Sequence, residues 1–306
     1  MDTSVVLAGL TLPHPITNGA GPCAKTVEDA KALIEAGVAM PVMGSYTILP
    51  RTGNPEPRYW DDGVNSINAI GLENGGKPYL KDHGPKMVEM AHAAGLHIGL
   101  SVAGSNAHEY LELTQTGKEI GFDFFEENVG CPNSEGTLIS FNLRLMEEIA
   151  RGVKKITPRF SLKPSPYSDP GLRLEVAQLY RDLEIPAVTL CNTFPDVLEL
   201  DEYLKPVLNP AIKGIGLGGG AGEMMRLISQ AHVWTFRQIL RPWQNIIAVG
   251  GVRAGWHVAH YLALGATMVQ IATAHAIEGS GVFNRVLQEY KALEVARQGR
   301  GFFLEA

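Results

Sequence analysis

The chain has 306 residues, of which 45% are hydrophobic and 19% charged, a composition that excludes a disordered protein. The formal net charge of −6 argues against a nucleic-acid-binding protein, which usually carries a basic surface. The sequence has no run of about 18 apolar residues and no basic start followed by an apolar core, so we expect neither a membrane span nor a signal peptide. Three widely spaced cysteines indicate reduced thiols and a cytoplasmic protein without a disulfide framework.

Short apolar runs alternate with helical patterns along the chain. Helix 27–37 is expected to begin after Thr26 as the N-cap and to stop at Gly37. Eight strands are expected, at 16–20, 38–43, 97–102, 122–128, 159–163, 187–191, 246–249 and 267–272. The other helices are expected at 107–116, 138–153, 171–183, 223–240, 255–264 and 281–297.

Eight strands that each precede a helix predict an α/β fold, a (β/α)₈ TIM barrel formed by residues 1–306 as a single domain. A doubly wound open sheet is the competing architecture. Two long segments, 44–95 and 192–222, do not fit the repeat and form insertions after strands 2 and 6. Segments of this length are usually functional or disordered, and both leave the strand ends where barrel enzymes place their active sites.

Polar and small residues recur where the expected strands end. Taken singly, each is compatible with a turn or an exposed side chain, but the barrel brings all of them to one face. These residues are Asn128, Cys131, Lys163, Asn192, Thr193, Gly250, Gly251, Ala272 and Thr273. The last four follow strands 7 and 8, which is the usual position of a barrel phosphate site. Lys163 could stabilise negative charge on a reduced flavin ring.

The glycine-rich run from Gly214 to Gly222 matches a dinucleotide-binding pattern by letter only. No clear strand precedes this run, and no acidic residue follows at the spacing that the motif requires. A loop that approaches a ring or phosphate closely is one interpretation, and a mobile turn is the other.

Cys131 lies between Gly130 and Pro132, in a loop beyond an apolar strand. A free cysteine is often a small buried hydrophobe, but a thiolate in a loop could act as a general base. Cys23 and Cys191 lie nearer expected strands and are interpreted as structural. No metal is expected, because histidines and carboxylates lack metal-ligand spacing, and no G-x-S-x-G motif indicates a hydrolase.

The chain resembles the class 1 dihydroorotate dehydrogenases nearly end to end, and most of all class 1A. The matching segments are Asn18–Gly21, Gly53–Tyr59, Ser66–Asn74, Asn128–Asn133, Leu162–Lys163, Cys191–Thr193, Val249–Gly251 and Gly265–Thr273. The resemblance implies FMN-dependent oxidation of (S)-dihydroorotate to orotate in pyrimidine biosynthesis. It further implies fumarate as a possible electron acceptor and a homodimer as the assembly.

The resemblance also implies a role for individual residues. Cys131 would remove a proton from the substrate while N5 of FMN accepts the hydride. Substrate contacts are implied for Asn68, Ala69, Ile70, Gly71, Leu72, Asn128, Asn133, Asn192 and Thr193. FMN contacts are implied for Ala20, Gly44, Ser45, Asn128, Lys163, Cys191, Gly220, Gly250, Gly251, Ala272 and Thr273.

One position departs from the family pattern, which normally has a lysine where this chain has Gly44. Losing a charge-assisted hydrogen bond costs roughly 1.5–3 kcal/mol. The alternative function is therefore an FMN enzyme of the same fold that acts on another pyrimidine or an activated alkene. A catalytically weak flavin- or ligand-binding relative is a third hypothesis, which Cys131 and Lys163 argue against. Candidates to replace the missing cation are Lys25, Lys77, Arg51 and Arg58.

Overall fold

The computed structural model describes residues 2–130, 139–209 and 211–299. Its main feature is a parallel sheet in which strands consecutive along the chain lie side by side, in the order β3-β14-β13-β10-β9-β8-β7-β4. These strands are β3 (Ile16–Asn18), β4 (Val42–Tyr46), β7 (Gly99–Val102), β8 (Phe124–Glu127), β9 (Phe160–Leu162), β10 (Ala187–Leu190), β13 (Asn245–Val249) and β14 (Met268–Ile271). The order confirms the predicted (β/α)₈ barrel.

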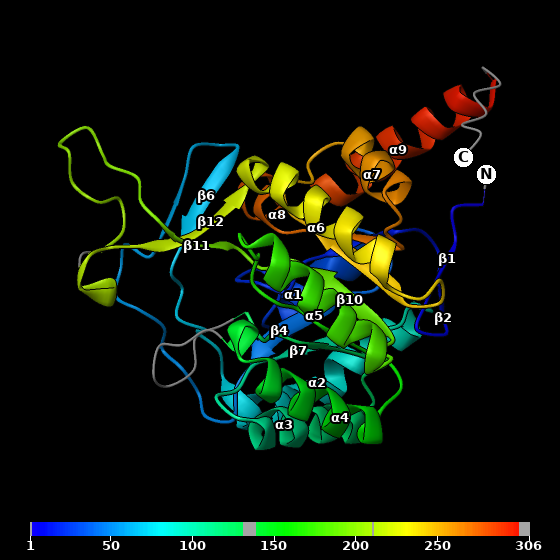
Figure 1. Ribbon diagram of the computed structural model, residues 1–306, viewed down its shortest axis with the longest axis horizontal. Helices are drawn as coiled ribbons and strands as arrows, with labels where there is room; N and C mark the ends of the chain where they lie inside the picture. Colours follow the sequence, from blue (N-terminus) through cyan, green and yellow to red (C-terminus); the bar gives the residue numbers. More distant parts are fainter. Residues whose placement is uncertain (1, 131–138, 210, 300–306) are drawn as a thin grey trace.

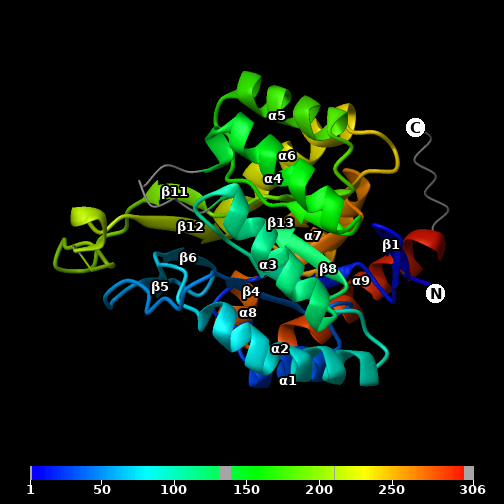
Figure 2. The ribbon, with the colours of Figure 1, turned by 90° about the horizontal axis from the view of Figure 1, so that it is seen from below.

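Helices surround the parallel sheet, as Figures 1 and 2 show. They are α1 (Val27–Glu35), α2 (Gly76–Ala93), α3 (Ala107–Ile120), α4 (Leu143–Ile156), α5 (Pro170–Asp182), α6 (Arg226–Ile239), α7 (Gly255–Ala263), α8 (Thr273–Glu278) and α9 (Gly281–Gly299). Thr26 caps α1 as predicted: its hydroxyl accepts from Asp29 N, and the Asp29 carboxylate accepts from Thr26 N. None of the helices in the described ranges is long and apolar enough to cross a membrane.

The barrel closes between β3 and β4 through the side chain of Asn18. Its Nδ2 donates to Val42 O at 2.8 Å, and its Oδ1 accepts from Val42 N at 2.9 Å. Thr17 Oγ1 also donates to Met40 O across the same seam. An amide carries both a donor and an acceptor, so one asparagine replaces a pair of ladder hydrogen bonds at the seam.

A hairpin of β1 (Val5–Leu7) and β2 (Leu10–Leu12), which the sequence did not predict, covers the N-terminal end of the barrel. Its buried leucines pack against residues at the starts of the barrel strands: Ala39, Met40, Val42, Phe124, Ala187, Ile247 and Met268. Residues 38–41 were expected to belong to the second strand. Ala39 and Met40 instead pack on the hairpin, and the strand begins at Val42.

Both long insertions contain regular structure that the sequence pattern did not predict. β5 (Tyr59–Asp61) and β6 (Asn65–Asn68) come from the first segment, and β11 (Phe194–Val197) and β12 (Gly218–Gly222) from the second. They form one antiparallel sheet, in the order β11-β12-β6-β5, that projects from the barrel at the left of Figure 1. The glycine-rich run is therefore partly a strand.

Helix α2 occupies the end of the first long segment and supplies the helix that follows the second barrel strand. Gly76, Gly84 and Pro85 obscure its sequence pattern, because glycine and proline are poor helix formers. Its buried face includes Leu80, Met87, Val88 and Ala91. Packing of this face outweighs the weak helix propensity.

Two adjacent glutamates of β8 face opposite sides of the barrel wall, as alternation along a strand requires. Glu126 points into the barrel, whereas Glu127 is fully buried towards α3 and contacts Thr114 Oγ1 at 3.0 Å. Thr114 Oγ1 also donates its single proton to Tyr110 O at 2.8 Å. Burial raises the pKa of Glu127 from 4.5 to about 8, so the carboxyl is mostly protonated at neutral pH and can donate to Thr114.

Replacing Asn18 with alanine should destabilise the barrel, because Val42 N and O lose their partners at a buried seam. Each buried unpaired group costs about 1–3 kcal/mol. Chemical unfolding of Asn18→Ala and of Asn284→Ala, an exposed asparagine of α9, measures the difference. Equal unfolding free energies for the two variants would contradict the role of Asn18 in closure.

The raised pKa of Glu127 predicts a stability that depends on pH. The folded state retains this proton more strongly than the unfolded state, so the contribution is complete below pH 4.5 and is lost as pH rises through about 8. Glu127→Gln should flatten the unfolding free energy across this range, each pKa unit being worth about 1.4 kcal/mol. Glu119→Gln, an exposed carboxylate of α3, should leave the slope as in the parent chain.

Candidate active site

Two adjoining cavities open at the C-terminal ends of the barrel strands. The first, called here the glycine-lined cavity, has a volume of about 90 Å³ and includes Gly222, Gly250 and Gly251 in its wall. The second, called the amide-lined cavity, has a volume of about 260 Å³ and includes Asn68, Asn128 and Asn192. Ala20, Asn192 and Thr193 line both cavities, so the two form a continuous site.

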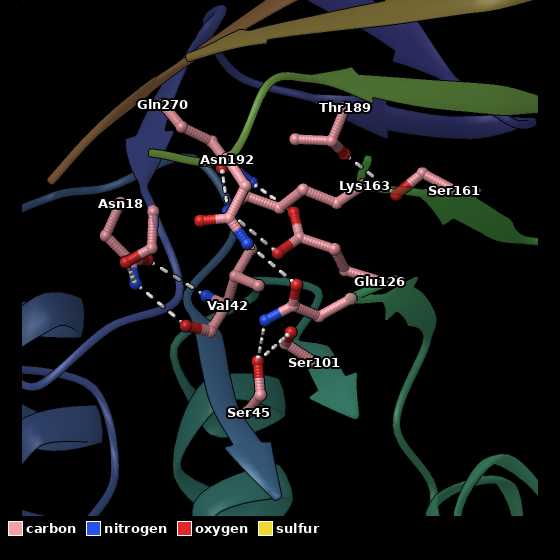
Figure 3. Close-up of polar contacts among 12 residues, drawn as sticks. Asn18, Val42, Ser45, Ser101, Glu126, Ser161, Lys163, Thr189, Asn192 and Gln270 are labelled. Carbon is pink, nitrogen blue, oxygen red and sulfur yellow. Dashed lines mark hydrogen bonds and ion pairs between the residues drawn. The ribbon is translucent and has the colours of Figure 1, made fainter. Parts of the chain in front are cut away.

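Lys163 enters the glycine-lined cavity from the end of β9 and is held by a buried polar network. Its Nζ lies 3.1 Å from Glu126 Oε1 of β8 and donates to Gln270 Oε1 of β14 at 3.3 Å. Gln270 Nε2 donates to Glu126 Oε2 at 2.8 Å and closes the triangle shown in Figure 3. An ammonium has three protons, so the two partners leave one for a ligand.

A chain of hydroxyl and amide groups orients the polar wall of the amide-lined cavity. Ser45 Oγ of β4 lies 2.8 Å from Ser101 Oγ of β7 and accepts from Asn128 Nδ2 at 3.0 Å. Asn192 Nδ2 donates to Asn128 Oδ1 at 2.9 Å. Figure 3 shows these groups converging from several barrel strands. Each amide is thereby fixed before any ligand binds.

The small antiparallel sheet covers part of this site. Asn68 Nδ2 of β6 donates to Gly219 O of β12 at 3.3 Å, and Ser66 Oγ lies 3.5 Å from Thr273 Oγ1. A Cβ atom at Gly219 would lie 2.2 Å from Thr193 Oγ1, which leaves no space for a side chain. Glycine in β12 therefore allows the sheet to approach the barrel mouth closely.

The glycine pair after β13 adopts backbone conformations that other residues rarely adopt, with φ of +140° at Gly250 and +69° at Gly251. A Cβ at Gly250 would meet Ser229 Cβ at 2.9 Å, and one at Gly251 would meet Arg226 Cβ at 2.7 Å. These close approaches explain why both positions are glycine. Both glycines also line the cavity, where backbone without side chains suits a phosphate group.

Most residues predicted for the site line one of these cavities. Ala20, Gly44, Ser45, Asn68, Ala69, Ile70, Gly71, Leu72, Asn128, Asn192 and Thr193 line the amide-lined cavity. Lys163, Cys191, Gly250, Gly251, Ala272 and Thr273 line the glycine-lined cavity. Gly220 lines neither and faces Met224 and Val197, whereas Gly219 and Ala221 on either side of it do line the site. Cys131 and Asn133 lie outside the described residues.

The two described cysteines have weakly acidic thiols. Burial raises the pKa of Cys191 to about 12, despite the nearby Lys163. Burial also raises the pKa of Cys23, with a further contribution from Asp29. A protonated thiol is a poor base, so neither cysteine is suited to proton abstraction at neutral pH.

The side chains that hold the predicted site residues in place were not themselves predicted from the sequence. Glu126, Gln270 and Ser101 are buried and were assigned no role. A signal was present for two of them, because Glu126 follows Phe124-Phe125 and Gln270 interrupts the apolar run Met268–Ile271. A polar residue in a buried strand needs a partner, and here the partners lie in other strands.

The barrel with its polar site at the strand ends has the architecture of a (β/α)₈ enzyme. The family model described as dihydroorotate dehydrogenase matches residues 3–293. The chain therefore belongs to the dihydroorotate dehydrogenase family, and it is an oxidoreductase that acts on CH–CH groups.

Individual relatives agree with this assignment. The chain is 30% identical over 301 residues to "Probable dihydroorotate dehydrogenase A (fumarate)" of Enterococcus faecalis, covering 97% of this chain and 95% of the relative. It is 29% identical to "Dihydroorotate dehydrogenase A (fumarate)" of Lactococcus lactis subsp. cremoris, covering 95% and 93%. The solved structure of DHODH from Eimeria tenella in complex with ferulenol shares the fold, with a TM-score of 0.80 at 20% identity over 96% of this chain and 85% of that one.

Gly44, where the resemblance leads us to expect a lysine, is constrained by its own backbone. Its φ is +103°, and a Cβ atom would lie 2.5 Å from Ser101 O and 2.9 Å from Tyr46 N. A side chain at this position requires movement of the backbone of β4 or β7. A lysine cannot be restored here without such a change.

Replacing Gly44 with alanine should therefore destabilise the protein more than the same change at Gly9. Gly9 also has a left-handed φ, of +83°, but nothing lies within 4 Å of its Cβ position. Gly9→Ala is expected to cost only the backbone term, about 1–2 kcal/mol. Unfolding free energies of the two variants measure the added steric cost at Gly44. A loss at Gly44 no greater than that at Gly9 would show that β4 accommodates a side chain.

Proposed function

We propose that this chain oxidises (S)-dihydroorotate to orotate with FMN bound in the continuous site. The observation that carries this proposal is the junction of a glycine-lined cavity, which contains a buried cation, with a cavity lined by amides. The names of the relatives, dihydroorotate dehydrogenase A (fumarate), support both the substrate and fumarate as the electron acceptor.

The residues present fit FMN. Gly250 and Gly251 offer bare backbone for the phosphate, and Arg253 adds a cation to the same cavity wall. Lys163 is positioned by Glu126 and Gln270 and would donate its remaining proton to a ring that becomes negatively charged. When bound, FMN supplies a two-electron acceptor for hydride.

The amide-lined cavity suits a pyrimidine ring. Such a ring alternates N–H donors and carbonyl acceptors, and carboxamides offer both kinds of partner. Asn128 and Asn192 are linked to each other and to Ser45, so their orientations are fixed in advance. Asn68 approaches from the small sheet on the other side of the cavity.

Cys131 is the proposed general base. Gly130 lines the amide-lined cavity, and Cys131 follows it directly in the chain. In the proposed reaction the Cys131 thiolate takes a proton from C5 of dihydroorotate while a hydride leaves C6. The two electrons of the hydride and one proton then reduce fumarate together with a second proton, giving succinate.

Anaerobic mixing of the FMN-loaded protein with dihydroorotate tests the proposal, with bleaching of the flavin absorbance as the measurement. We expect full bleaching, and Cys131→Ser should slow it by about two orders of magnitude or more at neutral pH, because a hydroxyl is a much poorer base. Cys23→Ser, which changes a thiol outside the two cavities, should bleach at the parent rate.

Failure to bind FMN would contradict the whole proposal, and an undiminished rate in Cys131→Ser would remove Cys131 from the reaction. Bleaching by dihydrouracil but not by dihydroorotate would favour the alternative of another pyrimidine substrate. The specific observation behind that alternative is Gly44, which provides no cation for the carboxylate of dihydroorotate.

A further inference from the structure

The charges around the amide-lined cavity are few. Among the described residues of its wall, Lys25 is the single cation, and Glu73 and Asp196 are the acids. Lys163 belongs to the wall of the glycine-lined cavity and is already held by Glu126. Lys25 is therefore the cationic side chain in this wall that can pair with a negative group of a bound ligand.

The backbone of Lys25 is fixed directly beside Gly44. Gly44 N donates to Ala24 O at 2.7 Å, which joins the middle of β4 to the residue before Lys25. Lys25 N donates to Asp29 Oδ2 at 2.7 Å, and Lys25 O accepts from the Tyr46 hydroxyl. From this anchored position Lys25 lines the amide-lined cavity, which Gly44 also lines without offering a cation.

Lys25 lies at the boundary between the amide-lined cavity and a third cavity, of about 770 Å³, that contains Arg51 and Arg58. Its side chain is partly buried, and no carboxylate of the described residues lies within ion-pair distance of its Nζ. Glu73, which lines both cavities, is held by Arg58 Nη2 at 2.7 Å. Burial lowers the pKa of Lys25, and Glu73 opposes this shift. An anion bound beside the ammonium would compensate the cost of its burial.

The other cations near the site are committed elsewhere or lie outside the amide-lined cavity. Lys77 donates to Glu112 Oε1 at 2.5 Å. Arg58 is bound between Glu56 and Glu73, at 2.6 and 2.7 Å. Arg51 is exposed and lines the third cavity but not the amide-lined cavity.

We propose that Lys25 is a specificity-determining residue that binds the carboxylate of the substrate from the β3–α1 loop, in place of the cation that Gly44 lacks. This inference rests on the proposed function, because dihydroorotate and orotate carry their carboxylate on the pyrimidine ring. The class of ligand that it selects is an anionic ring over a neutral ring of the same shape.

The competing explanation is a structural one, in which Lys25 only offsets the charge of Glu73. The proposal and the structural explanation differ in the effect on ligand binding that they predict for substitutions of Lys25. Lys25→Arg retains a cation for an anionic ligand, and Lys25→Met removes it while keeping a long side chain. Glu73→Gln removes the acid, so a purely structural Lys25 would become dispensable in that background.

Calorimetric titration with orotate and with uracil, which lacks the carboxylate, separates these explanations. We expect the parent chain to bind orotate more tightly than uracil. Lys25→Met should weaken orotate binding by about 10- to 100-fold, as for a lost charge-assisted hydrogen bond, and change uracil binding by less than about two-fold. Lys25→Arg should retain most of the preference, whereas Lys25→Met should lose it in the Glu73→Gln background as well. Lys77→Met, which removes a lysine outside the cavity, is the matched control.

The outcomes distinguish this inference from the proposed function. A parent chain that prefers orotate, with the preference intact in Lys25→Met, overturns the inference and leaves the function standing. Equal loss of orotate and uracil binding in Lys25→Met also overturns it. A preference that depends on Lys25, in a protein whose flavin dihydroorotate does not bleach, supports the inference and contradicts the proposed substrate.

In turnover with dihydroorotate the same variant provides a second readout. Lys25→Met should raise KM about as much as it weakens orotate binding and should change kcat less. A fall in kcat at unchanged KM would contradict a role in binding.

Discussion

The ion pair of Lys163 and Glu126 inside the barrel is the constraint on which the site depends. Burial of a carboxylate and an ammonium costs free energy unless the two are paired and further hydrogen-bonded. Here they pair with each other, and Gln270 accepts a hydrogen bond from Lys163 and donates one to Glu126. The three side chains come from β8, β14 and the end of β9, so they form only when the barrel closes in register. The same closure brings the hydroxyl and amide groups of Ser45, Asn128 and Asn192 together on the neighbouring wall. Closure of the barrel therefore also forms the site.

The small sheet and the glycines explain how a packed barrel leaves room at its mouth. Two segments far apart in the chain pair as β6 and β12 and lie over the strand ends, where Gly219 permits a close approach to Thr193. Gly250 and Gly251 leave bare backbone below it. Space at the barrel mouth thus arises from missing side chains, and its polar wall is formed by the amides that remain.

Much of the fold was predictable from the sequence, because continuous apolar runs and capped helices report local structure. The barrel order and the Thr26 cap were confirmed. Helix α2 was missed because glycines and Pro85 hide a face that tertiary packing buries. Glu126 and Gln270 stand out as polar residues in apolar strands, but their pairing with Lys163 was unpredictable, since they lie 37 and 107 positions away in the chain. The conformation of Gly44 depends likewise on contacts with another strand. The roles of Cys131 and Asn133 stay predictions.

The contact of Gly44 with the Ser101 carbonyl also bears on how this site can evolve. A lysine introduced at position 44 would meet backbone before it could meet a substrate. Direct substitution by lysine is therefore sterically closed, and a prior shift of β4 against β7 is required. Changes of ligand preference are expected to be easier in the loop before α1, because its side chains do not belong to a barrel strand.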